Sequence, residues 1–237
     1  MGKGHRDKVA VISGGANGIG QAFAKRLAAD GAHVAVVDVV PGDATVRLVE
    51  QAGREALAVT CDVSSPDAVA AMAKEVERRF GRCDILINCA GIFPQLPFEQ
   101  MTYAEWRRIL STNLDAVFAW AQEAARRMLA KGAGAIIFTG ASASVKGYPL
   151  SAPFAMGKFA LRGLAQSMAR ELAPQGIHVA HVVVDGGIRS ARRPDAADRP
   201  DSTLDPDAIA ASYLHLLQQE RSAWTWEIEL RPWVEKF

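Results

Sequence analysis

The chain has 237 residues, of which 49% are hydrophobic and 22% charged, a balance typical of a folded globular protein rather than a disordered one. Its 27 basic and 26 acidic residues leave a formal net charge of +1, and no basic stripe appears along the sequence. This charge distribution argues against a nucleic-acid or anionic-membrane partner, which would need clustered cations.

No stretch has the apolar character of a signal peptide or the length of a membrane span, so we expect a cytoplasmic protein. Cys61, Cys83 and Cys89 are odd in number and lack the spacing of metal ligands. They are interpreted as reduced thiols packed near strand ends, and no metal site is expected.

Short apolar runs rich in β-branched residues predict buried strands. Continuous apolar runs of this kind suit parallel strands that are covered on both faces. The predicted strands are 9–13, 33–38, 56–60, 84–88, 134–139 and 177–184, with a last strand within 224–233.

Segments with helical periodicity lie between these strands. The predicted helices are 18–30, one that starts near Pro66, 104–131, 152–173 and 206–219. Ser64-Ser65-Pro66-Asp67 supplies a cap and a first-turn proline, and Pro174 and Gly176 end the fourth helix. Alternation of this kind predicts one α/β domain over residues 1–237, a Rossmann-like doubly wound parallel sheet of about seven strands with helices on both faces.

Residues 190–205 are rich in Arg, Pro and Asp and have the weakest pattern in the chain. They are interpreted as a mobile substrate loop over the carboxyl ends of the strands, where such folds bind ligands. A plain solvated loop is the alternative. His178 and His181 lie within a buried strand run and are interpreted as core or interface residues rather than ligands.

A glycine cluster joins the first predicted strand to the first predicted helix. Glycine permits a tight turn and close approach of the backbone to a pyrophosphate, which the helix N-terminus then attracts. The residues expected to bind the cofactor here are Gly14, Asn17, Gly18, Ile19 and Gly20.

Asp38 stands eighteen residues after Gly20, at the carboxyl end of the second predicted strand. A carboxylate at this place accepts hydrogen bonds from the adenosine ribose and repels a 2′-phosphate. Neither Gly15 nor Val39 supplies a cation to neutralise such a phosphate, so the sequence favours NAD over NADP. The alternative is a surface Asp that caps the turn before Pro41.

Taken together, residues 6–190 resemble the short-chain dehydrogenase/reductase family. The motifs at the family's spacing are Gly14-x3-Gly18-x-Gly20, Asp62-Val63, Asn88-Cys-Ala-Gly91, Asn113 and Lys158. The resemblance implies that Asp62 and Val63 face the adenine and that Asn88, Ala90 and Gly91 line the cofactor. It also implies that Ile188 and Ser190 contact the carboxamide, although the family's preceding Pro is absent from Asp185-Gly186-Gly187.

The first half most resembles dehydrogenases of secondary aryl alcohols such as 1-phenylethanol. The second half, from about Ala121, resembles a different branch, so a mosaic origin is one interpretation. The family pairs two helices, here 104–131 and 152–173, with their copies across a two-fold axis. A homodimer or homotetramer is therefore expected.

The family's proton-transfer residues are incomplete in this chain. A Tyr stands four residues before the family's Lys, and a Ser stands thirteen residues before that Tyr; here these positions hold Phe154 and Ala141. By resemblance, Lys158 and Asn113 remain as catalytic residues. The alternatives are a surface lysine on the helix for Lys158 and a plain helix residue bonded to the backbone for Asn113. Ser142 and Tyr148 are candidate substitute donors, and their alternatives are a turn hydroxyl and a loop-packing aromatic residue.

Three hypotheses follow for the function. The first is an NAD(H)-dependent oxidoreductase that acts on a ketone or a secondary alcohol, with an altered acid–base site. The second is a catalytically weak or inactive dinucleotide-binding protein that acts as a sensor or assembly partner. The third, an epimerase or lyase on the same fold, has no residue in its favour. A proton donor near the nicotinamide would discriminate the first from the second.

Overall fold

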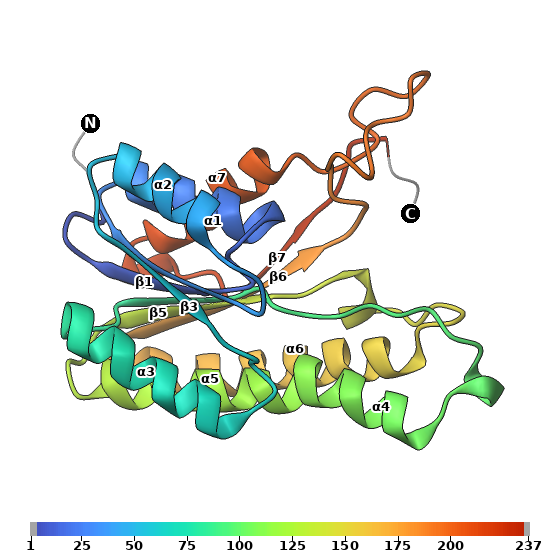
Figure 1. Ribbon diagram of the computed structural model, residues 1–237, viewed down its shortest axis with the longest axis horizontal. Helices are drawn as coiled ribbons and strands as arrows, with labels where there is room; N and C mark the ends of the chain where they lie inside the picture. Colours follow the sequence, from blue (N-terminus) through green and yellow to red (C-terminus); the bar gives the residue numbers. More distant parts are fainter. Residues whose placement is uncertain (1–3, 235–237) are drawn as a thin grey trace.

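A single parallel sheet forms the centre of the computed structural model, which describes residues 4–234. Its strand order is β3-β2-β1-β4-β5-β6-β7, and every neighbouring pair is parallel (Figure 1). The strands are β1 (Val9–Ser13), β2 (His33–Asp38), β3 (Ala56–Thr60), β4 (Ile85–Asn88), β5 (Gly134–Thr139), β6 (Ile177–Val184) and β7 (Glu227–Leu230). The predicted fold class is confirmed.

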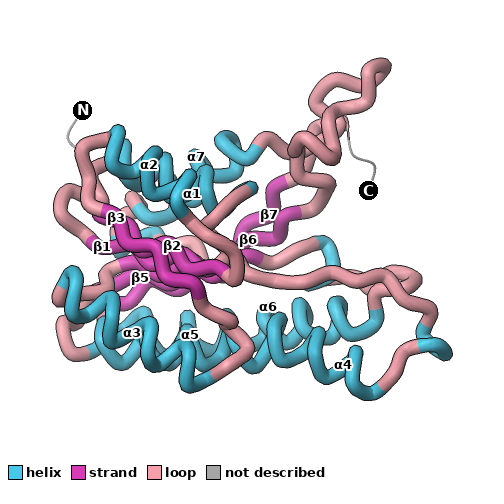
Figure 2. Tube along the Cα trace, viewed as in Figure 1, coloured by secondary structure: helices cyan, strands magenta, loops and turns pink. Residues whose placement is uncertain are grey.

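Helices cover both faces of the sheet. The helices are α1 (Gly18–Ala29), α2 (Asp43–Gln51), α3 (Pro66–Phe80), α4 (Tyr103–Leu110), α5 (Ala116–Leu129), α6 (Ala152–Leu172) and α7 (Pro206–Leu217). Figures 1 and 2 show α1, α2 and α7 on one face and α3 to α6 on the other. Each helical layer has its own apolar core against the sheet, so the strands are covered on both sides as their continuous apolar runs predicted.

Local sequence explains where α3 begins and ends. Ser65 accepts a hydrogen bond from the Ala68 N–H, and Pro66 occupies the first turn. Gly81 follows the helix with a positive φ of 66°, a left-handed conformation that glycine adopts without a steric cost. The buried residues Val69, Met72, Ala73 and Val76 recur at helical spacing. The predicted helix start at residue 66 is confirmed.

Two predictions about the helices need correction. The segment 104–131 is not one regular helix, because a π-helical turn, Ser111–Asp115, separates α4 from α5. The apolar face continues across this turn, so the periodicity did not reveal the insertion. Helix α2 was not predicted; only its Thr45 and Val49 are buried, which leaves a weak apolar pattern.

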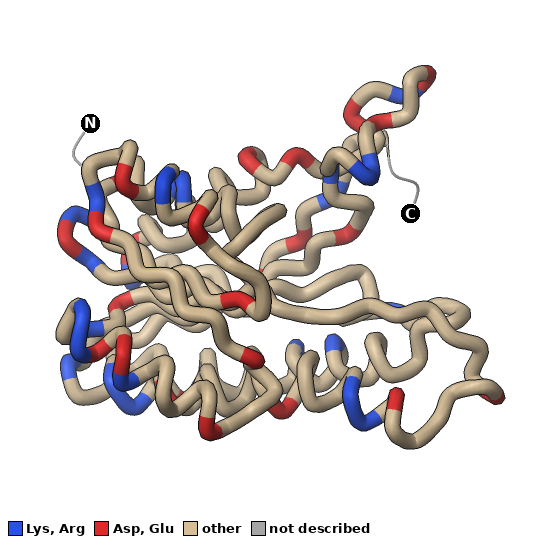
Figure 3. Tube along the Cα trace, in the orientation of Figure 1, with Lys and Arg blue, Asp and Glu red and all other residues tan. Residues whose placement is uncertain are grey.

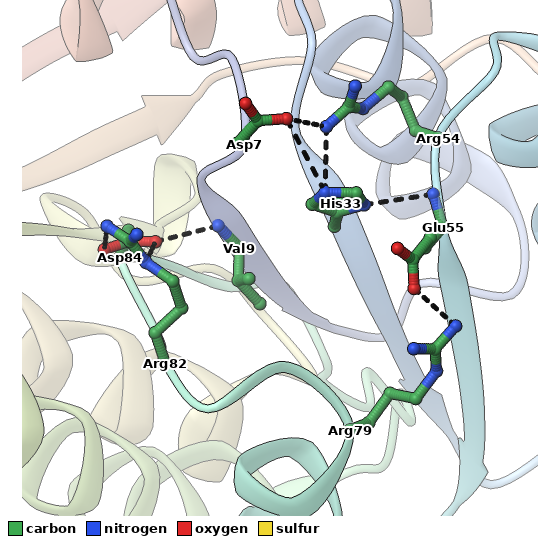
Figure 4. Close-up of polar contacts among 8 residues, drawn as sticks. All are labelled: Asp7, Val9, His33, Arg54, Glu55, Arg79, Arg82 and Asp84. Atoms are coloured by element: carbon green, nitrogen blue, oxygen red, sulfur yellow. Dashed lines mark hydrogen bonds and ion pairs between the residues drawn. The ribbon is translucent and has the colours of Figure 1, made fainter.

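Ion pairs brace the amino ends of the strands (Figure 4). Asp84, predicted as part of a strand, precedes β4 instead; its carboxylate accepts the Val9 N–H at 2.9 Å and pairs with Arg82 at 2.7 Å. Arg54 bonds Asp7 at 2.5 Å and His33 at 2.8 Å, on the same edge of the sheet. This edge is opposite the glycine cluster, so its polar network stabilises the fold and lies away from the ligand edge.

The histidines of β6 belong to the protein interior, as predicted. His178 stacks on Trp224 with ring centroids 4.7 Å apart, and its Nε2 lies 2.8 Å from the Thr225 carbonyl. His181 is fully buried, with Nδ1 3.0 Å from the Glu227 carboxylate. Burial lowers the pKa of both imidazoles, although each bond opposes that effect.

The strand order reverses between β1 and β4, which are neighbours in the sheet. Open α/β sheets bind their ligands at such a switch point, outside the carboxyl ends of the strands. Positive and negative charges are interspersed over the rest of the molecule (Figure 3). No helix within residues 4–234 is long and apolar enough to cross a bilayer.

Candidate active site

The glycine cluster lies where β1 meets α1, and its geometry excludes side chains. Gly14 has a φ of +70°, and a Cβ there would lie 2.9 Å from the Ala90 nitrogen. A Cβ at Gly20 would lie 2.0 Å from the Gly14 carbonyl oxygen. Gly18, in contrast, opens α1 beside empty space, because a Cβ there would have no neighbour within 4 Å. The turn therefore leaves room for an anion at the helix N-terminus.

Asn17 and Ile19 flank Gly18 in different ways. Asn17 is exposed and extended, and its side chain makes no hydrogen bond to cap α1. Ile19 is buried and forms part of the cavity wall described below. At this turn Gly18 thus leaves open space beside the backbone, Asn17 offers an exposed polar side chain, and Ile19 adds apolar surface to the cavity wall.

Asp38 ends β2 beside the glycine cluster. One carboxylate oxygen accepts the Ala16 N–H at 3.0 Å, and the other accepts the Val40 N–H at 3.3 Å. The residue therefore caps the turn before Pro41, as the alternative interpretation stated, and also braces the glycine turn. Both features place a carboxylate at the edge where a bound dinucleotide would present its adenosine ribose.

Asp62 and Val63 follow β3, the strand next to Asp38 in the sheet. Asp62 accepts hydrogen bonds from the Ser64 hydroxyl at 2.7 Å and the Ser64 N–H at 2.9 Å, and these bonds lower its carboxyl pKa. Val63 is buried. Both residues lie at the carboxyl edge of the sheet but outside the cavity described below.

The segment after β4 is held by a residue to which the sequence reasoning gave no role. The Ser13 hydroxyl accepts the N–H groups of Cys89 at 3.1 Å and Ala90 at 3.2 Å. Of the predicted residues here, Gly91 lines the cavity, while Asn88 is buried at the strand end and Ala90 packs behind it. The one sequence feature that could have indicated this role of Ser13 is its position at the end of β1.

Asn113 lies in the π-helical turn and is 1% exposed. Its side-chain oxygen accepts the Ile92 N–H at 3.1 Å, and its amide donates to the Ile92 carbonyl at 2.9 Å. The Asn113 side chain therefore fixes the strand-end segment beside the cavity, as its alternative interpretation stated. π-Helical turns are frequent at functional sites, and this one turns Asn113 inward.

A cavity of about 820 Å³ opens at the carboxyl edge of the sheet. It extends from Ile19, at the glycine turn, to Phe154 and Lys158 of α6. Its wall also includes Ala141, Ser142, Tyr148, Asp185, Ile188 and Ser190. The structure thus brings together residues from five separate parts of the chain that the sequence assigned to one site.

Lys158 projects from α6 into this cavity and is 7% exposed. Its Nζ donates to the Thr139 carbonyl at 2.7 Å. Burial lowers the pKa of this ammonium group from 10.5 to about 8. The alternative interpretation, a surface lysine, is wrong. An ammonium group has three N–H donors, so Lys158 retains donors that suit an acceptor such as the ribose hydroxyl of a dinucleotide.

Phe154 and Ala141, which the resemblance led us to expect at the family's Tyr and Ser positions, both line the cavity. The Phe154 ring packs on Phe93 with centroids 4.4 Å apart, and the Lys158 Nζ lies 5.7 Å from its centre. Neither side chain carries a proton that could be transferred. Phe154 and Ala141 therefore contribute only apolar surface to this cavity.

Ser142 and Tyr148, the candidate substitute donors, also line the cavity. The Lys146 ammonium lies 5.8 Å from the centre of the Tyr148 ring. A hydrogen bond with Tyr148 is the main cause of a raised Lys146 pKa, with Asp185 adding to it. Tyr148 is 44% exposed, whereas Lys158 is buried.

Asp185 directly follows β6 and is 5% exposed. Burial alone would raise its pKa, but the Ser142 hydroxyl, Lys146 and Arg231 outweigh that effect, and the net shift is downward. The Arg231 guanidinium lies 2.6 Å from the carboxylate. Asp185 is therefore an ionised anchor for the cavity wall, a role that its sequence position did not reveal.

The residues present fit a nicotinamide dinucleotide. The glycine turn offers open space at a helix N-terminus, Asp38 stands at the ribose edge, and Lys158 is a buried donor beside the cavity. Within residues 4–234, no group of three or more His, Cys, Asp or Glu could hold a metal ion. The fold and this arrangement define a dinucleotide-binding oxidoreductase class.

Comparison with known proteins identifies the family. A family model described as short chain dehydrogenase matches residues 8–199. The chain is 36% identical over 174 residues to an L-2,3-butanediol dehydrogenase of Corynebacterium glutamicum, covering 71% of this chain and 67% of that one. It is 36% identical over 181 residues to a cis-4-hydroxycyclohexanecarboxylate dehydrogenase of Sinomonas cyclohexanicum, covering 76% and 73%.

Solved structures agree with these relatives. A metagenomic short-chain oxidoreductase in complex with NADP superposes with a TM-score of 0.86 at 31% identity, covering 98% of this chain and 99% of that one. The chain belongs to the short-chain dehydrogenase family. It is an oxidoreductase of that family, whose members act on alcohols and ketones.

Proposed function

We propose that this protein is an NAD(H)-dependent oxidoreductase acting on a ketone or secondary alcohol, with an altered acid–base site. The observation that carries the proposal is the single cavity that joins the glycine turn to the buried Lys158. Such a cavity accommodates both a dinucleotide and a small substrate against its nicotinamide end. The resemblance to dehydrogenases of secondary aryl alcohols favours an aryl ketone or its alcohol.

When bound, the nicotinamide exchanges a hydride with the substrate carbon. Lys158 would hold the ribose through its buried ammonium, and Asn113 fixes the wall beside it. Ile188 and Ser190 would contact the carboxamide. The proton for the substrate oxygen comes from Ser142 or Tyr148, or from water, because Phe154 and Ala141 supply none. Catalysis by this chain accordingly rests mainly on proximity and orientation.

The second candidate function is a dinucleotide-binding sensor or assembly protein with little turnover. The apolar surface of Phe154 and Ala141, in place of two hydroxyl groups, favours it. NADH oxidation with a panel of aryl and alkyl ketones, measured beside direct NADH binding, decides between the two. NADH binding with steady turnover supports the oxidoreductase, and NADH binding without turnover of any ketone supports the sensor.

Free thiols at Cys61, Cys83 and Cys89 lead us to propose a reducing, cytoplasmic location.

Asp38→Ala should reduce the preference for NADH over NADPH. In the native protein a 2′-phosphate would meet the Asp38 carboxylate, a repulsion on the order of 1 to 2 kcal/mol near solvent and therefore about tenfold in relative affinity. The measurement is the ratio of the dissociation constants for NADH and NADPH, since loss of the bond between Asp38 and Ala16 weakens the binding of both cofactors. Asp67→Ala, an exposed acid on α3, serves as the control. Equal affinities in the native protein would refute NAD preference.

We further propose a homodimer or homotetramer formed through α5 and α6. Phe118 on α5 and Met156 and Phe159 on α6 are 52%, 51% and 47% exposed. Exposed aromatic surface of this kind favours burial against a second copy. Sedimentation velocity should show an oligomer that Phe118→Glu with Phe159→Glu dissociates, whereas Phe98→Glu at another exposed site leaves it intact. A native monomer at every concentration tested would contradict the proposal.

A further inference from the structure

The charged groups on the cavity wall are unequal in sign. Its cationic side chains are Lys158, Arg192 and Arg193, and its one acidic side chain is Asp185. Asp185 is already paired with Arg231 at 2.6 Å and Lys146 at 3.5 Å, and neither of these lines the cavity. Asp185 therefore does not balance the cations that face the cavity, and the cavity has a net positive charge.

Arg192 and Arg193 differ from a neighbouring arginine in the same segment. Arg189 pairs with Asp195 at 3.2 Å and also with Asp205. No carboxylate of residues 4–234 forms an ion pair with Arg192 or Arg193. The segment carries charges of both signs (Figure 3), so acidic residues were available nearby, but they engage Arg189 instead.

The backbone holds Arg193 at the cavity. Arg193 and Ser190 exchange both backbone hydrogen bonds at 3.0 Å, which closes a short turn after β6. The Arg193 side chain then crosses Gly187: a Cβ there would lie 3.0 Å from Arg193 Cδ and 3.1 Å from Nη1. Gly187 has no side chain, and this leaves the space that the guanidinium fills. Arg193 is exposed to solvent, and its turn and its packing over Gly187 hold the side chain at the cavity.

Another part of the cavity wall is apolar. Phe93 and Phe154 pack on each other there, and Ile92 also lines the cavity. A ligand that suits both parts of the wall has an apolar body and an anionic end. Guanidinium groups bind carboxylate and phosphate oxygens with paired hydrogen bonds, which adds direction to the charge attraction.

We propose that the substrate carries an anionic group, a carboxylate or phosphate remote from the reacting carbon, which Arg192 and Arg193 bind. The inference rests on the proposed function, because it places the ketone or alcohol end of the same molecule beside Phe154 and Lys158. It defines a class of substrate, the keto acids and hydroxy acids with an apolar body. The competing anion for these arginines is the diphosphate of the cofactor itself.

The test compares 4-acetylbenzoate with its uncharged methyl ester as substrates for NADH oxidation. The native protein should favour the acid by at least about tenfold in kcat/KM, as expected for a charge-assisted contact. Arg192→Ala with Arg193→Ala should remove this preference and leave the ester unchanged. Arg199→Ala, an exposed arginine of the same segment outside the cavity wall, should retain it. The preference should also fall as ionic strength rises.

Three results would overturn the inference. The first is a native protein that shows no preference for the acid, and the second is a double variant that keeps the native preference. The third is a double variant that binds NADH more weakly and loses kcat/KM equally for the acid and the ester. The last would assign the arginines to the cofactor diphosphate. If neither ketone is reduced, the proposed function fails, and calorimetric binding of 4-acetylbenzoate in the presence of NADH still tests the anion site. Binding that the double variant loses would support the site, and absence of binding to the native protein would refute it.

Discussion

The double variant Phe154→Tyr with Ala141→Ser should reduce ketones about 10²-fold faster than the native protein. This factor is the lower end of the rate acceleration that general acid–base catalysis contributes. Both residues line the cavity, and the Phe154 ring lies 5.7 Å from the Lys158 Nζ. A hydroxyl on that ring would therefore stand near a buried ammonium, which lowers the pKa of a phenol. Each single variant should gain much less in the rate of ketone reduction, because the effects of residues that act as a unit are not additive.

Steady-state NADH oxidation with aryl and alkyl ketones measures this gain, and NADH binding serves as the control for cofactor affinity. Lys158→Ala in the double variant should abolish the gain. A native protein that already turns over rapidly would indicate another donor, and Tyr148→Phe and Ser142→Ala would then identify it. A double variant that binds NADH normally and gains nothing would refute the assignment of Phe154 and Ala141 to the reaction centre.

Lys158→Met should stabilise the cofactor-free protein at neutral pH by roughly 2 kcal/mol, while weakening NADH binding. The Lys158 ammonium is buried, no carboxylate among residues 4–234 pairs with it, and its pKa falls from 10.5 to about 8 on folding. The folded state therefore binds fewer protons than the unfolded state between these two values. By linkage, this group's destabilising effect is complete below about pH 8 and disappears as the pH rises towards 10.5.

The measurement is the difference in unfolding free energy between Lys158→Met and the native protein, from denaturant titrations across this pH range. The difference should be largest near neutral pH and shrink at alkaline pH. Lys74→Met, on the exposed face of α3, should change stability little at any pH and controls for loss of a surface charge. A Lys158→Met protein less stable than the native one at neutral pH would show that the bond to Thr139 outweighs the burial of charge.

The local hydrophobic pattern of the sequence was sufficient to predict most of the strands and helices. The strands were readable because continuous apolar runs such as 9–13 and 177–184 suit only parallel strands covered on both faces. The π-helical turn at Asn113 was not readable, since one inserted residue leaves the apolar face of the two flanking helices continuous. Helix α2 was missed because it buries few side chains and its pattern is correspondingly weak.

For the site, the sequence by itself indicated the glycine turn, Asp38 and Lys158, and it predicted Phe154 and Ala141 at the family's Tyr and Ser positions, because these inferences depend on residue type at fixed spacing. Only the tertiary structure decided what depends on contacts between distant segments. It bonded Ser13 to Cys89 and Ala90 and made Asp185 the partner of Arg231. It also left Arg192 and Arg193 at the cavity wall with no ion-paired carboxylate among residues 4–234. Spacing along the chain carries no information on which charge neutralises which, because that depends on distances and burial that arise only when β6, β7 and the segment between them fold together.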